Sequence, residues 1–415
     1  MKKIIALLLA LVMCFALVAC GGGGNDTKPA DTTPADTTPA DTTPADTTPA
    51  DTTPSDAEKT FADTVGYRPD EADHFARDPY KVAFIVTAVS DYTQIAYDYM
   101  SEWGEKVFNM QIDLANANDD YDVYVTNIET YAVMGYDGMF IDAGGEINVR
   151  AAEVADELGV IYCTAIVPLY DDDGNVLHPS CSMNCYNAGV QMINWFEENV
   201  PNYWGDVKID DPNVGYIDAT FSMSKDFRDR TEGMQDRFLE LHPNKANDMF
   251  LFDAIVEGFT PDAAYNGITP ILTSNTQYDH WIIASISDRL ATGATRAAEE
   301  LGLNDGRVLI ACVDGNLIMS NWDDGYSDDC WVMGIWTPEV YQMQYCMAGL
   351  TAMLDGRATA ESLWSDKWST PSGYSMIYMP PYCVTRDNYK DLRAEALAYI
   401  DHGVETGEWN TEFGE

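Results

Sequence analysis

From residue 80 onward, short apolar runs alternate with longer amphipathic stretches, and this alternation constrains the fold more than any other feature. Residues 81–86 form an almost continuous apolar run, which is typical of a strand buried on both faces. Residues 93–108 follow with helical spacing. The same reasoning predicts further strands at 111–114, 138–141, 160–164, 214–217, 249–252, 281–286, 308–313 and 331–335, and further helices at 123–134, 148–158, 188–199, 225–241, 261–272, 290–301 and 338–354.

Repeated strand–helix alternation predicts an α/β fold, because parallel strands need helical crossovers that cover both faces of a sheet. The pattern occurs in two successive sets, so we expect two doubly wound parallel-sheet lobes joined by a three-strand hinge. The expected N-terminal lobe comprises 80–183 plus 338–375, and the C-terminal lobe comprises 184–337 plus 376–415. We place the hinge near 182–184, 336–337 and 374–377. Ligands of such sheets bind beyond the carboxyl ends of the strands, so two facing lobes predict a cleft.

The first 55 residues have a different character. Lys2 and Lys3 precede a short apolar run, which ends at Ala19 before Cys20 and four glycines. This arrangement resembles the bacterial lipobox, which predicts a signal peptide over 1–19 and lipidation of Cys20. The rest of 20–55 repeats Asp-Thr-Thr-Pro and cannot bury an apolar face, so we expect a solvated tether. The protein is therefore expected on the extracytoplasmic side of the cell membrane, held there by its lipid.

The formal net charge is −45, which disfavours nucleic acid as a partner because the phosphate backbone would be repelled. Seven cysteines lie beyond the tether, and this odd number leaves their redox state open. They are Cys163, Cys181, Cys185, Cys312, Cys330, Cys346 and Cys383. No Cys-x-x-Cys element or His-rich stretch accompanies them, so we expect no metal site. No phosphate-binding glycine motif or Ser/His/Asp set is legible, so we expect no cofactor and no catalytic residue.

Four short stretches carry a resemblance to a known family: residues 135–142 (Gly-Tyr-Asp-Gly-Met-Phe-Ile-Asp), residues 228–234 (Arg-Asp-Arg-Thr-Glu-Gly-Met), Ser287-Asp288, and Val313-Asp314-Gly315. In order and in these motifs, residues 80–400 resemble the type I periplasmic binding proteins, particularly the ribose- and galactose-binding group of sugar transporters. The resemblance implies a binding protein, not an enzyme, which delivers a small polar ligand to an ABC transporter permease. A monosaccharide is the ligand expected first, and the chain is expected to act as a monomer.

The resemblance also implies which side chains contact the ligand. Asp91 and Tyr92 lie in the loop after the first strand, and Asp142 follows the strand at 138–141. Arg228 matches the arginine that donates to sugar oxygens from the second lobe. The remaining positions implied are Asp288, Asp314 and Trp336. Carboxylates and guanidinium groups suit sugar hydroxyls, and flat rings suit the apolar face of a sugar.

Other interpretations of these residues remain open. Each Asp could cap the helix that follows it, Arg228 could form a surface ion pair, and both aromatic residues could simply pack between elements. Residues 171–175 resemble a calcium loop, but a hairpin turn is favoured because the terminal glutamate is missing. The same fold could instead bind a nucleoside, a furanose signal or an amine, or dock on a sensory receptor. A more distant alternative is a surface-anchored glycosidase.

Overall fold

The computed structural model of the chain describes residues 74–406, without residues 145–146, 172, 327–329 and 380. The predicted signal peptide, Cys20 and the tether lie outside the described residues. Among the described residues, no helix combines the length and the apolar character needed to cross a membrane.

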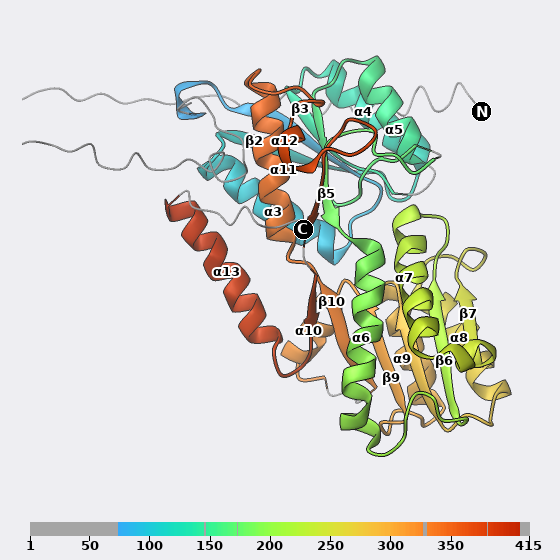
Figure 1. The fold of residues 1–415 in the computed structure, drawn as a ribbon. Coiled ribbons are helices and arrows are strands. Elements are labelled where there is room, and N and C mark those ends of the chain that lie inside the picture. The colour runs from blue at the N-terminus through green and yellow to red at the C-terminus, as the bar shows by residue number, and fades with distance from the viewer. Residues whose placement is uncertain (1–73, 145–146, 172, 327–329, 380, 407–415) are drawn as a thin grey trace, which may run out of the picture. The chain divides into compact units, whose positions relative to one another are not determined.

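The N-terminal lobe is built on a parallel sheet with the strand order β2-β1-β3-β4. Its elements in chain order are β1 (Tyr80–Val86), α3 (Asp91–Lys106), β2 (Met110–Asn116), α4 (Tyr121–Val133), β3 (Gly138–Asp142), α5 (Ile147–Glu157) and β4 (Tyr162–Thr164). A short 3-10 helix, η1 (His74–Ala76), precedes β1. In Figure 1, α4 and α5 lie on one side of this sheet, and α3 lies on the other.

The apolar run of β1 is buried on both faces, as the sequence predicts. Ala83 and Ile85 pack in one cluster with residues of α4 and α5. Val82 and Phe84 belong to a second cluster, which includes residues of α3 and of a helix from much later in the chain, α11 (Glu339–Leu354). A strand covered by helices on both faces has no reason to alternate apolar with polar residues.

The C-terminal lobe is built on a six-stranded sheet with the order β12-β10-β9-β8-β6-β7. Its elements in chain order are α6 (Cys185–Trp204), β6 (Val214–Thr220), α7 (Lys225–Leu241), η2 (Pro243–Asp248), β7 (Met249–Asp253), α8 (Pro261–Ser274), β8 (His280–Ser285), α9 (Asp288–Glu300), β9 (Val308–Val313), α10 (Asn316–Asp323) and β10 (Trp331–Trp336). All pairings in this sheet are parallel except that of β12 (Tyr382–Val384) with β10. The predicted α/β class with two parallel-sheet lobes is confirmed.

The chain passes between the two sheets three times, as expected of a three-strand hinge. It crosses after β5 (Ser180–Met183), after β10, and between β11 (Met376–Met379) and β12. β11 pairs in parallel with β5, so the strands that lead into two of the crossings lie side by side. The sequence predicted hinge segments at 182–184 and 374–377, but it did not predict that β5 and β11 pair with each other. The exact lobe limits at residues 183, 337 and 375 stay a prediction.

Several elements, most of them short, were not predicted from periodicity. They are β5, β11, β12, α10, α12 (Ser365–Trp368) and the C-terminal helix α13 (Tyr389–Thr406), which Figure 1 shows in red. Strands of three or four residues contain too few positions for an alternation to stand out.

The loop at 171–175 forms the hairpin turn that the sequence favours. Asp171 accepts from the backbone N–H of Asn175 at 2.7 Å, and an antiparallel bridge joins Tyr170 to Val176.

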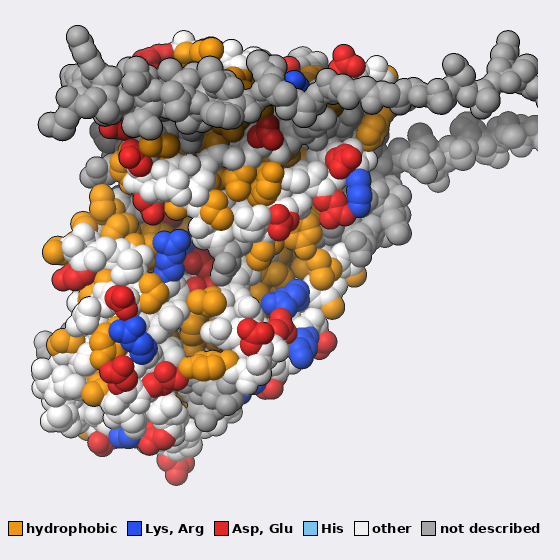
Figure 2. All heavy atoms as spheres, turned by 180° about the vertical axis from the view of Figure 1, so that it is seen from behind, with side chains coloured by type: hydrophobic (Ala, Val, Ile, Leu, Met, Phe, Trp, Pro, Cys, Tyr) orange, Lys and Arg blue, Asp and Glu red, His pale blue; other side chains and the backbone are white. Residues whose placement is uncertain are grey.

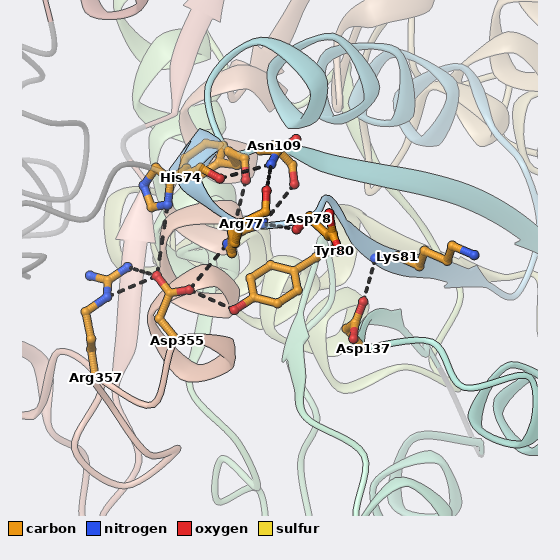
Figure 3. A network of polar contacts seen from close by, with 10 residues as sticks. His74, Arg77, Asp78, Tyr80, Lys81, Asn109, Asp137, Asp355 and Arg357 are labelled. Atoms are coloured by element: carbon orange, nitrogen blue, oxygen red, sulfur yellow. Dashed lines mark hydrogen bonds and ion pairs between the residues drawn. The ribbon is translucent and has the colours of Figure 1, made fainter.

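A polar network fixes the start of the described chain to the N-terminal lobe (Figure 3). The carboxylate of Asp355, just past α11, accepts the hydroxyl of Tyr80 at 2.8 Å and the guanidinium of Arg357 at 2.6 Å. Arg77 donates to the carbonyl oxygen of Phe108 at 2.8 Å, and its Nε lies 3.7 Å from Asp355. Because β1 starts here, the network lies at the amino end of the strand, whereas ligands of such sheets bind at the carboxyl end.

The seven cysteines are free thiols in the described residues, and six of them are buried. On the face that Figure 2 shows, Lys and Arg side chains occur in small separate groups among Asp, Glu and apolar side chains. This face therefore carries no continuous basic stripe that could follow a nucleic acid backbone.

Candidate functional site

A cavity of about 550 Å³ lies between the carboxyl ends of the two parallel sheets. Loops that follow β1, β2, β3 and β4 line it from the N-terminal lobe, and loops that follow β6, β7, β8 and β9 line it from the C-terminal lobe. The hinge contributes Ser182, Ile335 and Thr337. This is the place where open α/β sheets bind ligands, and the volume suits a small molecule such as a monosaccharide.

The wall from the N-terminal lobe is held by Gln342 of α11. Its amide donates to the carbonyl oxygen of Ile166 at 3.0 Å, and its side-chain oxygen accepts the hydroxyl of Tyr92 at 2.7 Å. Ser182 also donates to the carbonyl of Ile166, at 3.0 Å. Ile166 has a φ of +67°, a conformation that costs energy for a β-branched residue. The two hydrogen bonds to its carbonyl hold Ile166 at the cavity, and the third holds the ring of Tyr92 there.

Asp142 is the last residue of β3 and lines the cavity with 6% of its surface exposed. Its backbone carbonyl accepts the hydroxyl of the buried Tyr124 at 3.0 Å, which fixes the strand end. Burial, with a smaller contribution from the nearby charge of Asp226, raises the pKa of the Asp142 carboxyl to about 7. Asp142 therefore lies in a place where its charge lacks the stabilisation that water would give.

The wall from the C-terminal lobe is centred on Arg230, in the second turn of α7. Its guanidinium donates to the carbonyl oxygen of Ile286 at 2.6 Å and lies 3.4 Å from the carboxylate of Asp314. A close approach to α6 positions α7, the helix that carries Arg230. A Cβ on Gly189 would lie 2.1 Å from the carbonyl oxygen of Arg230, and one on Gly233 would lie 2.0 Å from that of Tyr186. Only glycine permits this helix contact, and the contact fixes the depth at which Arg230 enters the cavity.

Asp314 reaches the cavity through an unusual turn. Asp314 and Gly315 have φ values of +95° and +81°, and both conformations are favourable only for glycine. The carboxylate of Asp288 holds the turn by accepting the backbone N–H of Leu317 at 2.9 Å and that of Gly315 at 3.3 Å. Burial raises the pKa of Asp288 to about 7, and the charge of Asp314 adds to the effect.

Three phenylalanines provide an aromatic surface on the same wall. The ring centroids of Phe221 and Phe259 are 5.2 Å apart, and those of Phe227 and Phe259 are 5.1 Å apart. The guanidinium of Arg289 lies over Phe259, 5.4 Å from its centroid. Apolar ring faces suit the C–H face of a sugar.

A contact at the edge of the cavity joins the two lobes. The hydroxyl of Tyr170, in the loop between β4 and β5, lies 3.4 Å from the carboxylate of Asp226 at the start of α7. The ammonium of Lys225 lies 5.2 Å from the centre of the Tyr170 ring. Burial raises the pKa of Asp226 to about 6. The start of α7 thus contacts both the ligand cavity and the opposite lobe.

The structure brings together three of the residues expected from the sequence: Tyr92, Asp142 and Asp314 all line the cavity. Three others lie elsewhere. Arg228 is turned away and donates to the carbonyl oxygens of Ser222 and Met223 at 2.8 and 3.3 Å. Asp288 lies behind the Asp314 turn, and Trp336 lines a separate cavity of about 530 Å³ beside α3, α10 and α13. Asp91 begins α3, but its side chain lies outside the described part of the chain.

Sequence reasoning missed Arg230, Asp226, Gln342 and the phenylalanines. The motif at 228–234 contains two arginines two positions apart, and on a helix these point about 200° apart. Only the rotation of α7 about its axis decides which of them faces the cavity. Nothing in the sequence pointed to Gln342. It lies within α11, which is buried on almost every side, and not in a loop after a strand, where ligand contacts were expected.

Neither a protein-family model nor a curated protein matches this sequence. Solved structures do match. An ABC transporter solute-binding protein from Bacillus halodurans with bound myo-inositol has a TM-score of 0.58 at 14% identity, with 77% of this chain and 98% of the other covered. One from Actinobacillus succinogenes with bound D-allose has a TM-score of 0.58 at 17% identity, covering 75% and 99%. One from Agrobacterium vitis with bound D-fucose has a TM-score of 0.59 at 15% identity, covering 76% and 99%.

These likenesses extend over nearly the whole of each solute-binding protein and over the lobes described above. The strand orders of the two sheets and the three crossings between them agree with the expected architecture. The chain therefore has the type I periplasmic binding protein fold.

Proposed function

We propose that this protein is an extracytoplasmic solute-binding protein that captures a monosaccharide between its two lobes and delivers it to an ABC permease. The observation that carries the proposal is the cavity at the carboxyl ends of two facing parallel sheets, with polar and aromatic side chains from both. The matching solute-binding proteins have bound sugars or a cyclitol, which supports a ligand of this class.

The lining chemistry suits a polyhydroxylated ring. Arg230 can donate to ring or hydroxyl oxygens, and Asp142 and Asp314 can accept from hydroxyl groups. The phenylalanine surface can cover the apolar face of the ring. Because contacts come from both lobes, a ligand favours the arrangement in which the lobes approach each other, and the permease would recognise that arrangement.

We further propose that the protein binds its ligand without reacting with it, acts as a monomer, and is anchored through a lipid on Cys20. A carboxylate pair alone does not distinguish a binder from a glycosidase, so the proposal requires that labelled oligosaccharides remain intact after incubation. Radiolabelled palmitate should be incorporated by the full chain in a bacterial host and not by the Cys20→Ala variant.

The central experiment is a thermal-shift screen of the purified fragment that comprises residues 56–415. The screen covers monosaccharides, inositols, nucleosides and amines, and calorimetry follows for every hit. A monosaccharide that binds with micromolar or lower Kd supports the proposed function. Binding of only a nucleoside or a non-sugar amine would establish one of the alternative ligands on the same fold, and the monosaccharide assignment would be abandoned.

A further inference from the structure

The charges that line the cavity do not balance. Four carboxylates line it, from Asp119, Asp142, Asp226 and Asp314, but among the described residues only Arg230 and Arg289 contribute cations. Arg230 is engaged by Asp314 at 3.4 Å. The remaining excess is negative, and it lies in a region largely shielded from water.

Asp142 and Asp226 carry most of this excess. Both are only 6% exposed, and they line the same cavity from opposite lobes. In the part of the chain that the structure describes, neither carboxylate has an ion-pair partner: the neighbouring Lys225 is paired with Asp229. Asp226 accepts one long hydrogen bond from Tyr170, at 3.4 Å.

Two buried carboxylates without an ion pair of their own are costly to maintain, because desolvation penalises each charge and the charge of Asp226 also penalises that of Asp142. The charge of Arg230, which Asp314 engages, offsets the penalty on Asp226 only in part. The raised pKa values of Asp142 and Asp226, about 7 and about 6, reflect this cost. Sugar hydroxyl groups would satisfy hydrogen bonds but would leave the charge uncompensated. A ligand ammonium would compensate it and could donate hydrogen bonds to both carboxylates.

The geometry of the lining adds a second requirement. The phenylalanine surface formed by Phe221, Phe227 and Phe259 lies on the same wall as Asp226 and offers a broad apolar contact. A linear amine would leave this surface without a matching face, whereas a pyranose ring would cover it.

We infer that the ligand is a monosaccharide that carries a free, protonated amino group, with the ammonium between Asp142 and Asp226 and the ring against the three phenylalanines. This inference rests on the proposed function and specifies its substrate class.

The test uses matched sets of ligands at pH 7.5, measured by calorimetry on residues 56–415. Each set contains an amino sugar, the neutral hexose with a hydroxyl in its place, and the N-acetylated form, in the gluco, galacto and manno series. Putrescine is included as an amine without a ring. The inference predicts that at least one amino sugar binds about tenfold or more tightly than both its counterparts, since hydrogen bonds to charged groups are the stronger ones.

Two variants test the assigned carboxylates. Asp142→Asn and Asp226→Asn remove the charges with little change of shape, and each should reduce the ratio of amino-sugar to neutral-hexose affinity by about tenfold, whatever its effect on the hexose itself. Asp236→Asn, exposed on the same helix and outside this cavity, is the matched control and should retain the preference. The melting temperature of each apo variant shows that the fold is intact.

The other outcomes separate the two proposals. Equal or tighter binding of a neutral or acetylated sugar overturns the amino-sugar inference and leaves the monosaccharide function standing. Binding of putrescine alone overturns both. If no sugar of the three series binds, the amino-sugar inference is overturned, and the wider screen of monosaccharides decides the proposed function. A preference that survives both Asn variants would overturn the assignment of the ammonium to these carboxylates.

Discussion

The carboxylate of Asp288 accepts the backbone N–H of Gly315 at 3.3 Å, and through this bond it holds the turn that presents Asp314 to the cavity. The same carboxylate accepts the N–H of Leu317 and a hydrogen bond from the thiol of Cys312 at 2.9 Å. Asp288 thus serves the ligand site without lining it. Its role is to keep Asp314 in a conformation that a non-glycine residue avoids.

Asp288→Ala should therefore weaken ligand binding although the side chain lies outside the cavity. Loss of the acceptor leaves two backbone N–H groups unsatisfied and frees the strained turn, at a cost of ~1–3 kcal/mol in stability. We expect a clear rise in Kd by calorimetry and a lower Tm. Asp288→Asn keeps one acceptor oxygen and should restore part of the affinity. Unchanged binding in the Ala variant would show that the turn holds without Asp288.

Two arginines on the same helix give a matched pair of variants. Arg230→Ala should abolish ligand-induced stabilisation, because the guanidinium enters the cavity beside Asp314. Arg228→Ala should leave it largely intact, since that side chain donates to carbonyl oxygens of the preceding loop. Thermal shift with and without a saturating ligand distinguishes them. The reverse result would support the assignment that the sequence motif favoured.

The stability of the unliganded protein should increase as the pH falls from about 7.5 to about 5. Burial raises the pKa of Asp142, Asp218 and Glu339 to about 7 in the folded chain. In the unfolded chain these groups ionise near pH 4, so the folded state binds more protons between the two values. The stabilisation is complete below about pH 4 and is lost as the pH rises through about 7.

Melting curves across this pH range show directly whether the stability rises or falls with pH. Asp218→Asn should flatten the dependence without touching the ligand site, because Asp218 is bound by Tyr216 and Gln235 inside the C-terminal lobe. A Tm that rises with pH would contradict the assignment of these buried carboxyl groups.

The contact between α6 and α7 should tolerate no side chain. In Gly189→Ala the added Cβ would approach the backbone of α7 to 2.1 Å, so the helices must separate, with a cost of ~1–3 kcal/mol and a displaced Arg230. Gly144→Ala adds the same methyl group where no atom lies within 4 Å and should leave the apo Tm nearly unchanged. Chemical denaturation measures both. Equal stability of the two variants would refute the close helix contact.

The network at the start of the described chain should contribute more than a surface ion pair. Asp355→Asn removes the charge that Tyr80, Arg77 and Arg357 share, and we expect a loss of ~1–3 kcal/mol and faster hydrogen exchange near residue 80. Asp262→Asn breaks the exposed pair with Arg296 and should cost less than ~1 kcal/mol. Similar losses in both would show that burial of Asp355 adds nothing.

The sequence alone determined the fold class and the position of the site along the chain. Continuous apolar runs such as 81–86 identify strands buried on both faces, and alternation with helices leaves parallel sheets as the solution. Asp142 and Asp314 were expected from the resemblance to the sugar-binding family, which rests on short motifs at strand ends. Both properties are local, so a linear pattern can reveal them.

Only the tertiary structure decided which side chains enter the cavity. The rotation of α7 selects Arg230 over Arg228, and the glycine contact with α6 sets that rotation. Asp288 was expected to contact the ligand. In the structure it hydrogen-bonds the turn after β9 and so holds Asp314 in place. Gln342 reaches the site from a helix more than 150 residues beyond the loop it binds at Ile166. Such choices depend on how separate elements pack together, and no periodicity within one element records that packing.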